Sequence, residues 1–280
     1  MDLISFGSSS SYNCSILNIA NQTFIIDTGK IEPEFIQSYL LKSNLKNNKT
    51  LLITHAHYDH LSKNTFLISK ILNIPIYIHP ITFEVAIKKF NGVASTHPAE
   101  LIYLYKNSEL NFGKVEVKII KVPHQGMGDD EAGYSVSYFF ENKENENEKL
   151  FFGTDIGKIN DEIQKYINEA EILFIETNYD KSLVEKSPRY YKHKNWLFSE
   201  KGHLSNDDTA SAIRNGLIAR SGRPYKKIIL AHLSRTCNTP ELAKNAVIRE
   251  VKEFNQPKES ILTAPAKDIL ILKNFDLFLN

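Results

Sequence analysis

Cysteine is scarce in this sequence of 280 residues, where only Cys14 and Cys237 occur. Two cysteines exclude a disulfide framework and a cysteine-rich zinc module, and they suit a reducing compartment. The 34 Lys and Arg residues nearly balance the 33 Asp and Glu residues, so a net charge of +1 provides no global attraction to nucleic acid or to a membrane. No apolar run approaches the roughly 18 residues of a membrane span, and no basic and then apolar leader opens the sequence. We therefore expect a cytoplasmic protein with no membrane partner.

The apolar pattern that is present predicts a layered α/β protein. Hydrophobic residues make up 42% of the chain, too many for a disordered protein. Strand patterns fall at 16–19, 23–26, 50–54, 76–78, 101–105, 115–122, 133–140, 150–153, 172–175, 228–231 and 269–272. Helical patterns fall at 32–46, 62–72, 161–170, 205–220 and 240–254, and the polar run 141–149 is predicted to be an exposed hairpin loop. Because both halves mix the two patterns without a Pro/Gly/Ser-rich linker, we expect one domain over 1–280.

The densest group of metal-ligand residue types is Thr54-His55-Ala56-His57-Tyr58-Asp59-His60, directly after an apolar run. In an extended segment, residues two positions apart point to one face, so His55, His57 and Asp59 share a face. His60 breaks this alternation and can face a neighbouring point. Four such residues in six positions suit two adjacent divalent ions better than one, because imidazole nitrogen and carboxylate oxygen are standard zinc ligands. The alternative is a polar loop that holds several histidines without metal.

Three more ligand-type residues, His124, Asp155 and His232, each come shortly after a predicted strand. Loops at strand ends are where sheet proteins commonly place functional side chains. A residue of this kind, taken alone, is more often a turn residue than a ligand. Together with the histidine-rich stretch, they complete a set of seven candidate ligands.

This set resembles the signature of the metallo-β-lactamase superfamily, in which His-x-His-x-Asp-His precedes a later His, Asp and His in the same order. The resemblance covers nearly the whole chain and implies a four-layer αβ/βα sandwich with a dinuclear site at one edge. The ligands that it implies for the first metal are His55, His57 and His124. Those implied for the second metal are Asp59, His60 and His232, with Asp155 bridging the two. Asp27 matches an early Asp of the family that orients the histidine loop, and its alternative is an Asx turn.

Two divalent ions roughly 3.5–4 Å apart can hold a hydroxide between them and can clamp the oxygens of a phosphate ester. Hydrolysis by such a metal-bridging hydroxide is therefore the expected reaction. Zinc is the first expectation for the two ions, and the same ligands accept manganese or iron. We expect Asp59, Asp155 and His203 to be the catalytic residues.

His203 lies in Gly202-His203-Leu204-Ser205, just before a predicted helix in which Ser205 is the N-cap residue. A histidine beside a helix N-terminus suits a phosphate group and can donate a proton to a leaving oxygen. The alternative is a loop histidine without a role. A second helix is predicted to begin at Thr239 and Pro240, soon after His232.

These last segments resemble the YycJ (WalJ) group of the superfamily, which carries Gly-His-Leu-Ser-Asn, and His-Leu-Ser followed by Asn-Thr-Pro-Glu-Leu. The likeness extends to Gly7-Ser8-Ser9-Ser10, to Asn13-Cys14 and to Glu176-Thr177-Asn178-Tyr179-Asp180. It implies a phosphodiesterase that acts on nucleic acid, with 5′-exonuclease activity on DNA first. The residues that it offers to substrate are Ser8, Ser10, Asn13, Asn178, Ser205, Ser234 and Asn238. This chain has Ser11-Tyr12-Asn13 in place of the group's Ser-Gly-Asn, and its stretch 125–131 is longer and more acidic than the resemblance leads us to expect.

Charge is distributed unevenly along the chain. The segment 181–235 holds twelve basic and four acidic residues, a net charge of +8 within a chain of net charge +1. Such a segment can present a cationic face to phosphates, and Tyr190, Tyr191, His193 and Trp196 within it can stack on bases. The alternative is a solvated helix whose aromatic residues turn to the core. Nucleic acid, DNA before RNA, is thus the expected partner.

The ligand set alone fits two other kinds of enzyme equally well. One is a small-molecule hydrolase, either a cyclic phosphodiesterase or a thioesterase resembling glyoxalase II. The other is an endoribonuclease of the tRNA 3′-processing type (RNase Z), although we find no segment like the long tRNA-gripping arm of that group. A non-catalytic protein of the same fold is a further alternative, which the complete ligand set disfavours. The sequence leaves open the strand and end preference, the oligomeric state, and whether 125–131 and 141–149 gate the substrate.

Overall fold

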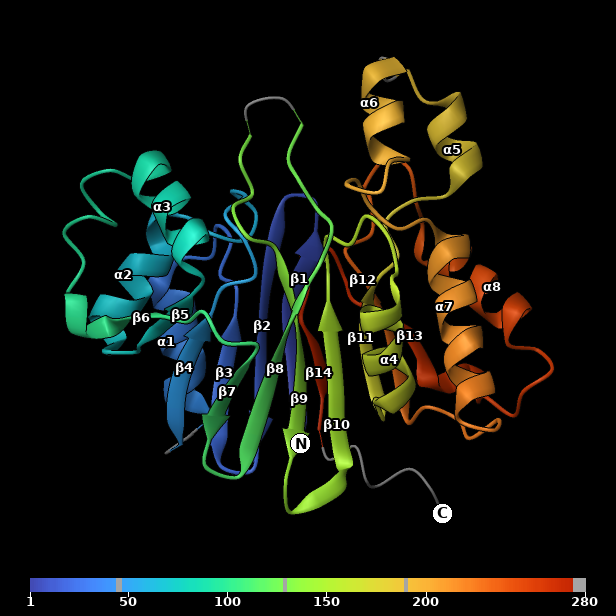
Figure 1. Ribbon diagram of the computed structural model, residues 1–280, viewed down its shortest axis with the longest axis horizontal. Helices are drawn as coiled ribbons and strands as arrows, with labels where there is room; N and C mark the ends of the chain where they lie inside the picture. The colour runs from blue at the N-terminus through green and yellow to red at the C-terminus, as the bar shows by residue number, and fades with distance from the viewer. Residues whose placement is uncertain (44–46, 128–129, 189–190, 274–280) are drawn as a thin grey trace.

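The computed structural model describes residues 1–43, 47–127, 130–188 and 191–273, and their strands form two seven-stranded mixed sheets (Figure 1). The first sheet contains, in spatial order, β14 (Leu270–Leu272), β1 (Asp2–Ser9), β2 (Tyr12–Ile19), β3 (Gln22–Ile26), β4 (Asn48–Leu52), β5 (Ile76–Ile78) and β6 (Ile102–Leu104). The second contains β13 (Ile261–Thr263), β12 (Lys227–Ala231), β11 (Ile172–Glu176), β10 (Asn145–Gly153), β9 (Val136–Asn142), β8 (Val115–Lys121) and β7 (Glu109–Phe112).

The alternation of side chains along the strands divides the core into three layers. In β1, Leu3 packs in the central layer between the sheets, whereas Ile4 packs in the layer beneath the helices of the first half. In β12, Ile229 packs in the central layer and Ile228 packs outward. Successive strand residues point to opposite faces, so each sheet supplies one face to the central layer and one to an outer layer.

Helices cover the outer face of each sheet (Figure 1). The outer layer of the first sheet includes buried residues of α1 (Pro33–Lys42), α2 (Lys63–Leu72) and α3 (Pro80–Lys89). That of the second includes buried residues of α4 (Asp161–Glu169), α7 (Asn206–Ala219) and α8 (Pro240–Glu250). The expected four-layer αβ/βα sandwich is confirmed. Among the described residues, no helix combines the length and the apolarity that crossing a bilayer requires.

Parallel pairing determines where the functional loops meet. Strands β10, β11 and β12 are parallel neighbours, as are β3 and β4. The carboxyl ends of parallel strands lie at one edge of a sheet, so the segments that follow them come close together. Two short helices, α5 (Lys181–Lys186) and α6 (Tyr191–Leu197), follow β11 and extend beyond this edge (Figure 1).

The run 141–149, predicted to be a loop, is instead mostly strand. Strand β9 ends at Asn142 and β10 begins at Asn145, so Lys143 and Glu144 form the turn. The prediction was wrong because charged side chains here pair across the strands, as Lys149 does with Glu141 at 3.1 Å, and leave no apolar alternation to detect. Since Asp155 comes after the far end of the nine-residue β10, this turn lies roughly 30 Å from it and cannot border the site.

Other boundaries differ by smaller amounts. The helix predicted at 32–46 ends at Lys42, and residues 44–46 lie outside the described part. The helix predicted at 240–254 ends at Glu250. Helix α3 was not predicted, because Ile81, Phe83 and Val85 alternate at the twofold period of a strand and obscure the helical pattern.

Candidate dinuclear metal centre

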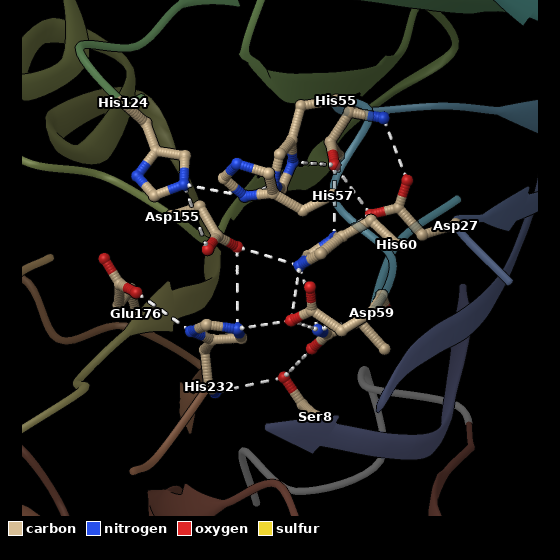
Figure 2. A network of polar contacts seen from close by, with 12 residues as sticks. Ser8, Asp27, His55, His57, Asp59, His60, His124, Asp155, Glu176 and His232 are labelled. Atoms are coloured by element: carbon tan, nitrogen blue, oxygen red, sulfur yellow. Dashed lines mark hydrogen bonds and ion pairs between the residues drawn. The ribbon is translucent and has the colours of Figure 1, made fainter. Parts of the chain in front are cut away.

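Four buried donor atoms converge at the end of β4 and β8. His55 Nε2 lies 3.0 Å from His57 Nδ1, and His124 Nε2 lies 3.2 Å from the same atom. Asp155 Oδ1 completes the group at 3.5 Å from His124 Nε2. All four side chains are buried, and their ligand atoms lie within 4.8 Å of one another. Figure 2 shows the three histidines on one side of Asp155.

A second donor group lies on the other side of Asp155 (Figure 2). Asp155 Oδ2 is 3.0 Å from His60 Nε2 and 3.6 Å from His232 Nε2, yet it accepts no hydrogen bond. Asp59 Oδ2 lies 3.4 Å from His60 Nε2 and 3.5 Å from His232 Nε2. One carboxylate therefore separates two groups of donors and faces both. The predicted ligands, which come from four different places in the chain, are brought together.

Asp27 holds the histidine loop from behind. Its Oδ1 accepts a hydrogen bond from Thr54 N at 2.8 Å, and its Oδ2 accepts one from Thr54 Oγ1 at 2.7 Å. The same Oδ2 lies 2.7 Å from His60 Nδ1. Asp27 thus orients both the start of the loop and one of its rings, as the resemblance implied.

Glu176 has the equivalent position behind the second group, and the sequence reasoning did not select it. Its Oε1 contacts His203 Nδ1 at 2.7 Å and His232 Nδ1 at 3.0 Å. Its Oε2 accepts hydrogen bonds from Ile156 N and Leu204 N. Burial opposes the charge of Glu176, but His203 and then His232 outweigh it and lower its pKa to about 2. A charged residue at the end of the apolar run 172–175 was the signal that could have found it.

The backbone is left-handed at three of these positions. Asp27 has φ 54°, Asp155 has φ 56° and His232 has φ 56°. Non-glycine residues adopt this region at a cost of roughly 1–3 kcal/mol each, and such residues cluster at functional sites. Each of the three follows a strand closely, so the turn redirects its side chain from the sheet toward the common centre.

Three of the histidines are neutral at pH 7. Burial lowers the pKa of His55 and His57 and lowers that of His124 to about 4. A neutral imidazole has a lone pair available, so these rings need lose no proton before they bind a cation.

The other two histidines carry protons in the metal-free protein. Burial opposes the charge on His60 and His232, but Asp155 and then Asp59 outweigh it and raise both pKa values, that of His232 to about 10. Burial likewise opposes ionisation of these two carboxyl groups, yet the neighbouring histidines keep their pKa values low. The second group is therefore a set of opposite charges in which a divalent cation can replace the protons.

A cavity of about 570 Å³ opens onto both donor groups. Of the residues expected to contact substrate, three line it, namely Ser10, Asn178 and Ser234. His203 also lines it, as do His193 and Trp196 of α6. Trp196 Nε1 donates a hydrogen bond to Gln125 O at 3.0 Å, which ties α6 to the loop after His124.

The remaining expected substrate contacts lie away from this cavity. Ser8 Oγ accepts a hydrogen bond from His232 N, and Asn13 Nδ2 lies 2.9 Å from His60 Nε2. Ser205 is buried as the N-cap of α7, and Asn238 bonds to Asn206 and to backbone carbonyls. Each of these four side chains makes hydrogen bonds within the protein, which a sequence does not reveal. Their assignment to substrate stays a prediction.

Among the described residues of the basic segment 181–235, three arginines pair with acidic residues from outside the segment. Arg214 pairs with Glu253 at 2.7 Å, and Arg223 pairs with Glu171 at 2.7 Å. Arg220 is buried and lies 3.4 Å from Glu171. Acidic partners from outside the segment thus neutralise part of its charge, while Arg189 and Tyr190 lie outside the described residues.

The donor atoms fit a pair of divalent metal ions. Each group combines imidazole nitrogen with carboxylate oxygen, the ligands that zinc and its neighbours accept. Asp155 faces both groups, with Oδ1 toward His124 and Oδ2 toward His60 and His232, which is the arrangement of a bridging ligand.

A family model described as a beta-lactamase superfamily domain matches residues 23–220. The chain belongs to this superfamily. This superfamily member is 26% identical over 211 residues to the exodeoxyribonuclease YycJ of Bacillus anthracis. The aligned region covers 75% of this chain and 73% of that protein. The chain is 25% identical over 249 residues to the exodeoxyribonuclease WalJ of Streptococcus pneumoniae, covering 88% and 86%. The resemblance to the metallo-β-lactamase superfamily and its YycJ/WalJ group is thereby confirmed.

The same fold occurs in the crystal structure of zinc-bound PqqB from Methylobacterium extorquens. The TM-score is 0.64 over 97% of this chain and 100% of that chain, at 12% sequence identity. At this identity the likeness bears on the fold alone. This superfamily member is a metallo-hydrolase with buried His/Asp groups consistent with a dinuclear site.

Proposed function

We propose that the protein is a metal-dependent phosphodiesterase that hydrolyses nucleic acid, with 5′-exonuclease activity on DNA as its leading activity. The observation that carries this proposal is the pair of buried donor groups that share Asp155 beside an open cavity. The choice of DNA rests on the two curated relatives, which are both exodeoxyribonucleases and cover most of the chain.

Two divalent ions, zinc first and manganese or iron next, complete the proposed site. The residues that hold the first ion are His55, His57 and His124. Those that hold the second are Asp59, His60 and His232, with Asp155 shared by both. A bound pair of this kind lowers the pKa of water and stabilises the attacking and leaving oxygens of a phosphate ester.

His203 is the proposed general acid. Its Nδ1 contacts the ionised Glu176 at 2.7 Å, so Nε2 is the nitrogen available to the substrate. Glu176 orients the ring, and proton transfer to a leaving oxygen by a positioned histidine contributes typically 10²–10⁴-fold to a rate. His203 lines the cavity beside Asp155, with His203 Nδ1 3.7 Å from Asp155 Oδ1.

The proposed nucleic-acid contacts lie on the cavity wall and on α6. Ser10, Asn178 and Ser234 offer polar groups to a phosphate or sugar, whereas His193 and Trp196 offer rings on which a base can stack. Lys192 and Lys194 are on the same helix as these rings. Within 181–235, this helix is therefore the part that we assign to DNA.

The test uses single- and double-stranded DNA and RNA labelled at either end, with a panel of divalent metals. We expect release of mononucleotides from the 5′ end of DNA. Asp155→Ala and His57→Ala should lose at least about 100-fold of this activity. His203→Gln should lose a similar factor at unchanged metal content.

Variants that digest DNA as fast as the parent would refute the proposal. Turnover of a thioester or of a cyclic phosphodiester, without oligonucleotide cleavage, would assign the site to a small-molecule hydrolase. Internal cleavage of a tRNA precursor alone would assign it to an endoribonuclease.

A further inference from the structure

Each histidine of the donor groups has a second ring nitrogen, and nearly all of these nitrogens have a partner. His55 Nδ1 contacts Thr54 Oγ1 at 3.0 Å, and His124 Nδ1 contacts Gly202 O at 2.9 Å. His60 Nδ1 and His232 Nδ1 contact Asp27 and Glu176. Such outer partners fix the tautomer and the orientation of a metal-binding ring.

His57 is the exception among the described residues. Its Nδ1 faces the first donor group, so Nε2 is the nitrogen that points away from that group. Nε2 is buried without a hydrogen-bond partner, in a side chain that is only 10% exposed. Asp130 Oδ2 lies 3.7 Å from His57 Nε2, slightly beyond hydrogen-bond length.

Asp130 is held in this place by Lys89, at the end of α3. Lys89 Nζ lies 2.6 Å from Asp130 Oδ1 and donates to Glu131 O at 2.8 Å. The same ammonium group donates to Ala56 O at 3.0 Å, between two of the metal-site histidines. Ala56 N in turn donates to Ala132 O at 2.8 Å. One lysine thus joins the acidic loop to the histidine loop.

The loop also passes very close to His57 at Gly126. A Cβ atom on Gly126 would lie 2.8 Å from His57 Nε2 and would overlap the carbonyl group of Asp130. Only glycine allows this approach, so the backbone at Gly126 and Asp130 covers the ring nitrogen and excludes solvent from it.

We propose that Asp130 is the positioning residue for His57 and accepts a hydrogen bond from His57 Nε2–H when metal occupies the first donor group. A shift of less than 1 Å closes the present separation to hydrogen-bond length. Asp130, in a stretch that departs from the pattern of the related group, then has a physical role. It completes the outer contacts of the metal site. This inference depends on metal binding and not on any substrate.

The test measures metal affinity of the full-length protein by competition with a chelator of known affinity. Asp130→Ala should weaken binding at one of the two metal positions by about 10–100-fold, the usual loss for an outer partner. Asp130→Asn, which keeps an acceptor oxygen, should lose less than Asp130→Ala. The matched control is Glu131→Gln, because Glu131 pairs with Lys88 on the exposed side of the same loop. The metal affinity of Glu131→Gln should stay within twofold of that of the parent protein.

Equal affinities for Asp130→Ala and the parent, within twofold, would overturn the inference. If Asp130→Ala does not fold, the metal affinity of Asp130→Asn is compared with that of Glu131→Gln. A loss of at least threefold supports the role of Asp130, and no difference rejects it. If the parent protein shows no nuclease activity, the metal affinities can still be measured and compared. The inference and the proposed function therefore fail separately.

Discussion

Glu176 controls two rings of the site through one carboxylate. Its Oε1 contacts both His203 and His232, and two backbone amides fix the other oxygen. Because its pKa is lowered to about 2, it is ionised throughout the neutral range and can hold a positive charge on either ring. A hydrogen bond to a charged group is worth about 1.5–3 kcal/mol. The negative charge of Glu176 therefore contributes more to holding the two rings than the shape of its side chain does.

We expect Glu176→Gln to reduce phosphodiester hydrolysis by about 10–100-fold, since it retains the shape but removes the charge. Steady-state kinetics with a chromogenic phosphodiester measures this. The control is Glu171→Gln, which neutralises a second buried carboxylate just before the same strand, where it pairs with Arg220 and Arg223. That variant should lose stability and keep its kcat. Equal kcat values for both variants would contradict the role given to Glu176.

At the scale of elements, helix α7 starts where the site needs a rigid support. Ser205 Oγ accepts a hydrogen bond from Asp208 N at 3.1 Å, and Asp208 Oδ2 accepts one from Ser205 N at 3.2 Å. In the same turn, Thr209 Oγ1 donates to Glu176 O at 2.6 Å. The capping box therefore stabilises the helix and also links it to the end of β11.

Ser205→Ala should lower the free energy of unfolding by about 1 kcal/mol and should also lower activity several-fold, because the cap adjoins His203. Thr239→Ala is the matched variant, since Thr239 caps α8 by accepting from Leu242 N. For Thr239→Ala we expect the same decrease in the free energy of unfolding and no change in activity. Urea unfolding and steady-state kinetics separate the two effects, and an equal loss of activity in both variants would show that the cap of α7 has no special part in the site.

At the scale of the whole molecule, the donor groups join the two sheets. His55, His57, Asp59 and His60 follow a strand of the first sheet, whereas His124, Asp155 and His232 follow strands of the second. A metal pair that binds both sets stabilises the folded state in which the sheets are packed together. The sequence-based expectation that 1–280 is one domain remains a prediction.

Calorimetry of the metal-loaded and metal-stripped protein tests that prediction. Free metal at 100 times its dissociation constant adds about 2.7 kcal/mol per site, or about 5.4 kcal/mol for two sites, so stripping should lower Tm by roughly 10–20 °C. Both forms should unfold in one transition if the chain is one domain. Two separate transitions in the loaded protein would contradict it.

Much of the site could be predicted because its signal is local. The spacing predicted that His55, His57 and Asp59 share one face, and His55 and His57 do lie in one donor group. Residues 57–60 form a turn instead of an extended segment, so Asp59 lies with His60 in the second group. The later ligands stand just past apolar runs. Glu176 was missed although it follows the same kind of run, since a lone glutamate is a common residue at a strand end.

The sequence by itself determined the mixed α/β layering and singled out the candidate ligands, because periodicity and spacing are properties of neighbouring residues, and the family resemblance supplied the four-layer sandwich and the grouping of the ligands. Tertiary structure alone decided which way Ser8, Asn13, Ser205 and Asn238 point. It also decided that Arg220 and Arg223 meet Glu171, and that Asp130 lies beside His57. These outcomes depend on contacts between segments far apart in the chain, whose distances are determined only when the two sheets and their loops pack together.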